Sequence, residues 1–143
     1  MEFNINFFSV VVCVLFSFAF SFVWYTALFM KPWTKEMGYD PTMRPDKKQM
    51  MKGMAVSILG NFLFVWMLAF YLAGWKYFPN SGEMGIISFA VNSALSVWLG
   101  FFVPVHLSKI VWERHSWKLF FINSGYNLVS AIFVAIILAY WTT

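Results

Sequence analysis

The sequence predicts an all-α integral membrane protein, a four-helix bundle whose antiparallel spans run up and down across the bilayer. Of its 143 residues, 61% are hydrophobic and only 11% are charged. Such a composition is typical of a membrane protein rather than of a soluble domain. The charges are also gathered, since Lys76 is the only one of the ten Lys and Arg residues outside 31–52 and 109–118. We therefore expect residues 1–143 to form a single transmembrane domain.

Four apolar stretches are the expected spans. They cover residues of about 5–30, 53–75, 84–108 and 117–141, each long enough at ~1.5 Å per residue to cross a core of ~30 Å. A polar loop over residues 31–52 joins the first two spans, and its three prolines allow helix only in short pieces.

The starts of the later helices carry capping signals. Asp46 with Gln49 three residues on resembles a capping box, so the second helix is expected to begin near Lys47. Ser81 is the expected cap of the third span, and Ser116 that of the fourth.

Pro104 lies inside the third span. A proline has no N–H to donate to the carbonyl of Gly100, so we expect a kink there and a free acceptor inside the membrane. His106 follows at the membrane edge, where a lone histidine is interpreted as an interfacial residue rather than a catalyst.

The distribution of Lys and Arg predicts the orientation of the chain. The basic loop 31–52 and the basic segment 109–118 fall on the same side of a four-span protein. Positive loops face the cytoplasm, so both termini are expected on the non-cytoplasmic side of the cell (inner) membrane. The net charge of +4 is explained by cations that flank apolar runs. The expected partner is therefore the lipid bilayer, and no nucleic-acid partner is expected.

Small residues recur every four positions along the first span. They are Ser9, Cys13, Ser17 and Ser21. Membrane helices use such spacing to bring their backbones close together, so this stripe is expected to face another helix rather than lipid. Cys13 is the single cysteine, which we interpret as a small buried thiol.

Polar and aromatic residues with hydrogen-bonding groups are expected to form one layer inside the bundle. Its members are Ser21, Asn61, Trp66, Trp98, Gly100, Pro104, Asn123, Tyr126 and Asn127. Counted at ~1.5 Å per residue, one member from each span lies roughly 10 to 14 Å from the basic interface. A buried amide needs a partner, so Asn61 or Asn127 is expected to meet the free carbonyl of Gly100. Asn123 lies nearer the basic surface, at the mouth of this layer.

The spans contain no Asp, Glu, Lys or Arg at membrane depth, which disfavours a proton-coupled transporter. They also lack a set of residues for nucleophilic, metal-assisted or paired-carboxylate catalysis. Asp40 and Asp46 are interpreted as turn and cap residues rather than metal ligands. We therefore expect no enzyme, no catalytic residue, no metal and no cofactor.

Two functions stay open on the sequence. In the first, the bundle is an assembly or accessory subunit, a homo-oligomer or part of a larger membrane complex, and the polar layer locks the helices together. In the alternative, the same layer binds a ligand or lets a small solute pass. An intramembrane enzyme is a third and least favoured class.

Three motifs carry a family resemblance, WYTALFMKPWTKEMG after the first span, VWLGFF in the third and WKLFFINSGYNLV in the fourth. With them the chain resembles the bacterial membrane family called domain of unknown function seventeen-sixty-one. The family commonly has Ser-Pro where this chain has Thr26-Ala27. The resemblance implies four helices and no established activity. The positions that carry its pattern are Trp24, Tyr25, Trp33, Trp98, Gly100, Phe101, Asn123, Gly125 and Tyr126.

Overall fold

The structure is a computed structural model that describes residues 3–142. All regular structure within this range is helical. Four of its helical stretches are long and apolar enough to cross a membrane, namely Phe7–Leu28, Lys47–Tyr77, Ile86–Trp112 and Trp117–Trp141. The predicted all-α fold with four spans is confirmed.

The first span is α1 (Phe7–Phe22), continued by the π-helix η1 (Val23–Leu28), and the short helix α2 (Met30–Met37) follows it. Helix α2 ends at Gly38, whose φ of 72° is a left-handed conformation that glycine adopts without strain. The second span is α3 (Lys47–Ala73). After it comes the 3-10 turn η2, formed by residues 75–77.

The third span consists of α4 (Ile86–Val97), the π-helix η3 (Trp98–Phe102) and α5 (Val103–Trp112). In η3 the N–H of Val103 donates to the carbonyl of Trp98, five residues earlier. This wider turn places Pro104 in the first turn of α5, where a missing N–H is tolerated. The sequence had indicated an interruption at Pro104 but not its π-helical form, and the kink stays a prediction. The fourth span is α6 (Trp117–Thr142).

The predicted caps have different outcomes. Helix α3 begins directly after Asp46, although the Asp46 side chain makes no capping hydrogen bond. Ser116 is confirmed as a cap, because its Oγ accepts from the N–H of Leu119 at 3.1 Å. The prediction for Ser81 was wrong, since α4 begins only after Gly85. The Ser81 hydroxyl donates instead to the carbonyl of Lys76, within the turns that precede the helix.

Helix α6 is the centre of the bundle, since it contacts α1, α3, α4 and α5. Its Ala131, Ala135 and Ala139 are fully buried, and so are Ala90 and Ala94 of α4. Small side chains let helix backbones approach closely, which is how membrane helices associate in the absence of water. The core therefore depends on close contact along α6.

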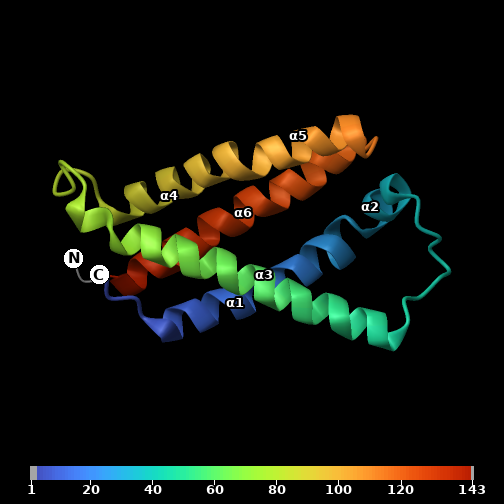
Figure 1. Ribbon diagram of the computed structural model, residues 1–143, viewed down its shortest axis with the longest axis horizontal. Helices are drawn as coiled ribbons and strands as arrows, with labels where there is room; N and C mark the ends of the chain where they lie inside the picture. Colours follow the sequence, from blue (N-terminus) through green and yellow to red (C-terminus); the bar gives the residue numbers. More distant parts are fainter. Residues whose placement is uncertain (1–2, 143) are drawn as a thin grey trace.

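The bundle is tight at the end that holds the termini and open at the end that holds the basic segments. The buried residues of α3 begin only at Val65, and every residue from 47 to 60 is exposed. At this open end, Figure 1 shows the start of α3 lying apart from α5 and α6. The first half of α3 is therefore not packed into the core at that end.

The predicted stripe of α1 faces protein. Ser9 is 3% exposed, Cys13 and Ser17 are 0% exposed, and Ser21 is half-buried. The carbonyl of Ser17 accepts a hydrogen bond from the Tyr126 hydroxyl at 3.2 Å. The Ser17 Oγ itself is buried without a partner in the described part of the chain. The stripe thus gives α1 its close contact with the bundle.

Leucine at Ser17 tests this packing. It adds bulk at a site that is 0% exposed, so the free energy of unfolding should fall by ~1–3 kcal/mol. Ala19→Leu adds a similar bulk on an exposed face of the same helix and should change stability by less than ~0.5 kcal/mol. Ser17→Ala should keep or raise stability, because the hydroxyl has no partner. Reversible unfolding in mixed micelles measures all three, and equal losses from both leucine variants would show that the stripe is no interface.

Candidate functional site

Two tryptophans from different spans bind the first third of α6. The indole Nε1 of Trp24 donates to the carbonyl of Ile122 at 3.1 Å, and that of Trp98 donates to the carbonyl of Ser124 at 2.8 Å. A buried indole N–H needs an acceptor, and a helical carbonyl has a second lone pair to offer. Residues two apart on a helix point in nearly opposite directions, so the two rings approach α6 from different spans. Both tryptophans belong to π-helical segments, η1 and η3.

Two tyrosines continue this network toward α1. The Tyr25 hydroxyl donates to Asn123 Oδ1 at 2.9 Å. The Tyr126 hydroxyl reaches back to the carbonyl of Ser17. The two tyrosine rings lie side by side with centroids 5.4 Å apart. The side-chain oxygen of Asn123 is therefore bonded to Tyr25 across the interface between the first and fourth spans.

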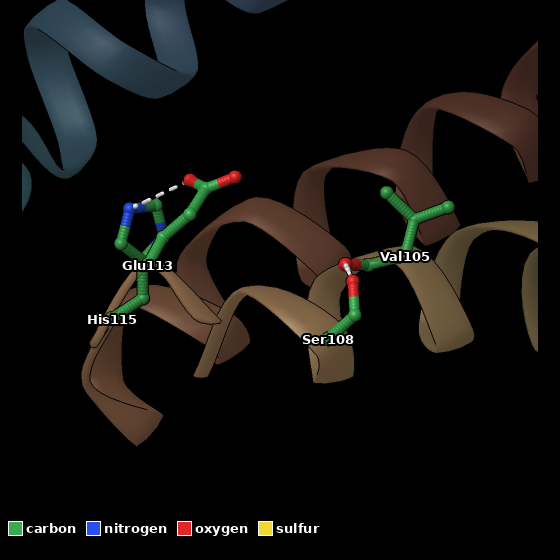
Figure 2. Close-up of polar contacts among 4 residues, drawn as sticks. All are labelled: Val105, Ser108, Glu113 and His115. Atoms are coloured by element: carbon green, nitrogen blue, oxygen red, sulfur yellow. Dashed lines mark hydrogen bonds and ion pairs between the residues drawn. The ribbon is translucent and has the colours of Figure 1, made fainter. Parts of the chain in front are cut away.

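The turn that joins α5 to α6 sets the register between these helices. The N–H groups of Glu113 and His115 both donate to the carbonyl of Lys109, at 3.1 and 3.2 Å. His115 Nε2 also lies 3.3 Å from Glu113 Oε2 (Figure 2), but the Glu113 side chain is 56% exposed and such a pair contributes little. Ser108 donates to the carbonyl of Val105 in the same helix, so its hydroxyl is satisfied locally. The backbone bonds of the turn therefore fix which residues of α5 and α6 face each other.

His106 and Asn127 face each other in this register. Asn127 Nδ2 lies 2.7 Å from His106 Nε2, a hydrogen bond between the third and fourth spans. Because an amide nitrogen only donates, the imidazole accepts at Nε2 and carries its proton on Nδ1. From the sequence alone, His106 is interpreted as a lone interfacial histidine without a partner in the spans. Counting residues from the turn does not give this pairing, since His106 precedes the end of α5 by six residues and Asn127 follows the start of α6 by ten.

A cavity of about 390 Å³ lies between α1, α3, η3 and α6 and is here called the polar cavity. Its lining consists of neutral polar groups with a few apolar neighbours, and no lining side chain is charged. The lining residues are Ser21, Tyr25, Ser57, Gly60, Asn61, Phe64, Phe102, Tyr126, Asn127 and Ser130. Hollows of about 590 and 650 Å³ lie near the other end of the bundle, beside η2 and the loop before α4. The polar cavity differs from them because its lining comes from the interior of the spans.

Asn61 stands out among the lining residues. It is half-buried, and its side-chain amide has no hydrogen-bond partner within residues 3–142. The other asparagine of the lining, Asn127, is already bound to His106. The cavity therefore contains one amide that is satisfied by protein and one that is not.

The structure brings Ser21, Asn61, Tyr126 and Asn127 of the expected layer together around the polar cavity. Asn123 reaches its edge through the bond to Tyr25.

The other members of the expected layer lie elsewhere. Trp98 binds α6 on another side. Trp66 stacks on Phe62 beside the core, with ring centroids 5.9 Å apart. Gly100 and Pro104 are exposed. The expected contact of Asn61 or Asn127 with the Gly100 carbonyl is wrong for Asn127, which bonds to His106, and is not formed by Asn61. The π-helical turn of η3 changes the direction of the residues around it, and Phe102 lines the cavity instead.

Sequence reasoning did not assign Ser57, Phe64, Phe102 or Ser130 to this site. Ser57 was within reach, because it lies one turn before Asn61 on the same face of α3. Ser130 likewise lies one turn after Tyr126, on the same face of α6. Phe64 and Phe102 gave no signal of their own, since phenylalanine is frequent throughout the spans.

Outside the spans, Asp40 is a turn residue as expected. Its Oδ1 accepts from the hydroxyl and the N–H of Thr42, at 2.7 and 2.8 Å. These two bonds hold the pKa of the Asp40 carboxyl below its ordinary value. Within residues 3–142, no three His, Cys, Asp or Glu side chains are grouped to hold a metal ion.

Comparison with known protein families matches residues 8–139 to one family, described as Protein of unknown function (DUF1761). No curated protein and no solved structure matches the chain. The matched range runs from α1 to α6 and includes Trp24, Trp98 and the whole lining of the polar cavity. The resemblance seen in the three sequence motifs is confirmed, and the chain belongs to the DUF1761 family.

Proposed function

We propose that this protein binds a small uncharged polar molecule, or the uncharged polar head of a larger one, in the polar cavity within the membrane. The observation that carries this proposal is the free amide of Asn61 in a cavity lined by hydroxyl and amide groups. We propose binding or passage rather than catalysis, because the lining residues include neither a histidine nor an acid. The neighbouring His106 is hydrogen-bonded to Asn127 through its Nε2.

The cost of an unpaired amide supports a ligand. An amide that leaves water without finding a partner loses on the order of 2–7 kcal/mol. If the polar layer served only to lock helices, both asparagines would be paired across the bundle. Asn127 fits that role through His106, whereas Asn61 does not. Water is the plainest occupant of such a cavity, and the experiment below separates it from a specific ligand.

The lining also selects for an uncharged ligand. None of its side chains is ionised, so neither a phosphate nor an ammonium group would find an opposite charge in the cavity. An unpaired charge in a low-dielectric site is far more costly than an unpaired amide. Uncharged groups with oxygen or nitrogen atoms match the hydroxyl and amide lining instead.

A second candidate function is assembly. Residues 47–60 of α3 are exposed throughout, and the Cα atoms of Gly53 and Gly60 have open space beside them. Ser57 lies between these glycines, so small residues repeat along this half of the helix. Because small residues permit close helix contacts in membranes, a second copy or a partner subunit could pack there.

Leucine substitutions at the two asparagines separate these functions. Asn127→Leu removes the bond to His106 and should lower the free energy of unfolding by ~0.6–1.7 kcal/mol. Asn61→Leu removes an amide without a partner, so stability should stay or rise while a ligand retained from native membranes is lost. Unfolding in micelles measures the change in stability, and mass spectrometry of the intact protein detects the retained ligand. The mass spectrum also gives the number of protein copies in each particle, which tests the assembly function. If Asn61→Leu destabilises as much as Asn127→Leu and no small molecule accompanies the wild type, the cavity is not a ligand site.

We also propose that the basic end of the bundle faces the cytoplasm, in the cell membrane. The support is that α2, the start of α3 and the turn between α5 and α6 gather at one end, whereas both termini lie at the other (Figure 1). Nine of the ten Lys and Arg residues lie in 31–52 and 109–118, at the first of these ends. The potential of anionic lipids on the cytoplasmic side favours this orientation.

Cysteine labelling in whole cells tests the orientation. In a Cys13→Ser background, Glu83→Cys should react with a membrane-impermeant maleimide from outside, since Glu83 is exposed in the loop between α3 and α4. The matched variant is Met43→Cys in the basic loop, where the native side chain is 76% exposed. It should react only after the membrane is permeabilised. The reverse pattern would place both termini in the cytoplasm.

A further inference from the structure

We propose that the ligand is an amphiphile with an uncharged, oxygen-bearing head and one long apolar chain. The head occupies the polar cavity, and the chain lies in an adjoining groove between α3 and the region of α4 and η3. This inference rests on the function proposed above, because it names the chemical class of that ligand.

The groove has a volume of about 410 Å³ and is here called the apolar groove. Its lining is apolar except for one tyrosine. The lining residues are Leu63, Phe64, Met67, Leu68, Tyr71, Val97, Phe101 and Phe102. They come from the middle of α3, the end of α4 and η3, which places the groove deeper in the membrane than the basic end.

The apolar groove and the polar cavity adjoin. Phe64 and Phe102 line both of them. Their rings meet edge to face with centroids 5.5 Å apart. The two phenylalanines therefore mark the place where a polar site changes into an apolar one.

One face of α3 shows the same change along its length. Ser57, Asn61, Phe64, Met67 and Tyr71 follow one another at intervals of three or four residues, so they share one side of the helix. The first two line the polar cavity and the last two line the apolar groove. From Asn61 to Tyr71 the helix rises ~15 Å, enough to accompany a stretch of extended acyl or prenyl chain. A polar head followed by an apolar tail matches this face in both order and length.

The acyl chains of ordinary lipids fill grooves on any membrane protein, so the apolar groove by itself does not distinguish the proposed ligand from a phospholipid. The selection comes from the head. At roughly 10 Å below the interface, the charged head of a phospholipid would leave water and find no counter-charge in the polar cavity. An uncharged head avoids that cost and supplies partners for Asn61. A prenyl quinone and a glycerol monoester share this chemistry, and the experiment distinguishes the two.

Photolabelling of the full chain in phosphatidylcholine nanodiscs tests the inference. Three probes carry the same apolar chain with a diazirine at its end, and their heads are a dimethoxy-methyl-benzoquinone, glycerol and glycerol phosphate. At least one uncharged probe should label residues 63–71 or 97–102 in a saturable manner. The phosphate probe should label them weakly and without saturation. Whichever uncharged head competes more strongly identifies the source.

Variants separate the head site from the chain site. Asn61→Leu should lower saturable labelling at least tenfold, as should Met67→Trp, which fills the apolar groove. Leu15→Trp is the matched control, since Leu15 and Met67 are both 63% exposed and Leu15 lies on α1, outside both linings. It should leave labelling unchanged. Shortening the probe chain to two carbons should weaken binding to the wild type at least tenfold, a test that needs no variant.

Two outcomes overturn the inference and are distinguishable. If the chainless heads shift the melting temperature of the wild type but not of Asn61→Leu, and a long chain adds no affinity, the cavity binds a polar solute and the groove plays no part. If all three probes label alike and Asn61→Leu changes nothing, the contacts are those of ordinary lipid. In that case the proposed function fails together with the inference.

Discussion

A polar group inside hydrocarbon needs a hydrogen-bond partner. In this fold, polar side chains of the other spans find theirs on the first half of α6. The indoles of Trp24 and Trp98 donate to neighbouring carbonyls of α6, Tyr25 meets Asn123, and His106 meets Asn127. Each bond joins α6 to another span. Since hydrophobic attraction between helices is weak in lipid, these bonds and the close contact of small residues determine how the helices are placed.

The two π-helical segments are part of this arrangement. Each supplies a tryptophan that binds α6, and η3 also adapts the third span to Pro104. π-helical turns in membrane and soluble helices occur frequently at functional sites, where they redirect side chains. Here the redirected residue is Phe102, which stands between the polar cavity and the apolar groove.

The four spans, the buried stripe of α1 and the meeting of Ser21, Asn61 and Asn127 were predictable from the sequence, because they depend on apolar length and on helical periodicity. The partner of Asn127 was not predicted, because His106 and Asn127 lie six and ten residues from the turn between α5 and α6, so residue counting alone does not pair them. The prediction that Gly100 belongs to the polar layer was wrong because it used only the depth of each residue in the membrane. Depth does not tell which side of the helix a residue faces, and the π-helical turn of η3 changes that side. The exposure of the first half of α3 was not predicted, since residues 53–60 were interpreted as part of an apolar span and apolar composition does not say which residues another helix covers.

The central claim is that Asn61 meets a ligand rather than protein. A density map of the protein, extracted with native lipid and without added ligand, measures this most directly. The account predicts non-protein density in the polar cavity within hydrogen-bonding distance of the Asn61 amide, continuing past Phe64 and Phe102 into the apolar groove. A closed cavity in which Asn61 bonds to a side chain of α1 or α6, or a cavity that holds only water, would contradict it.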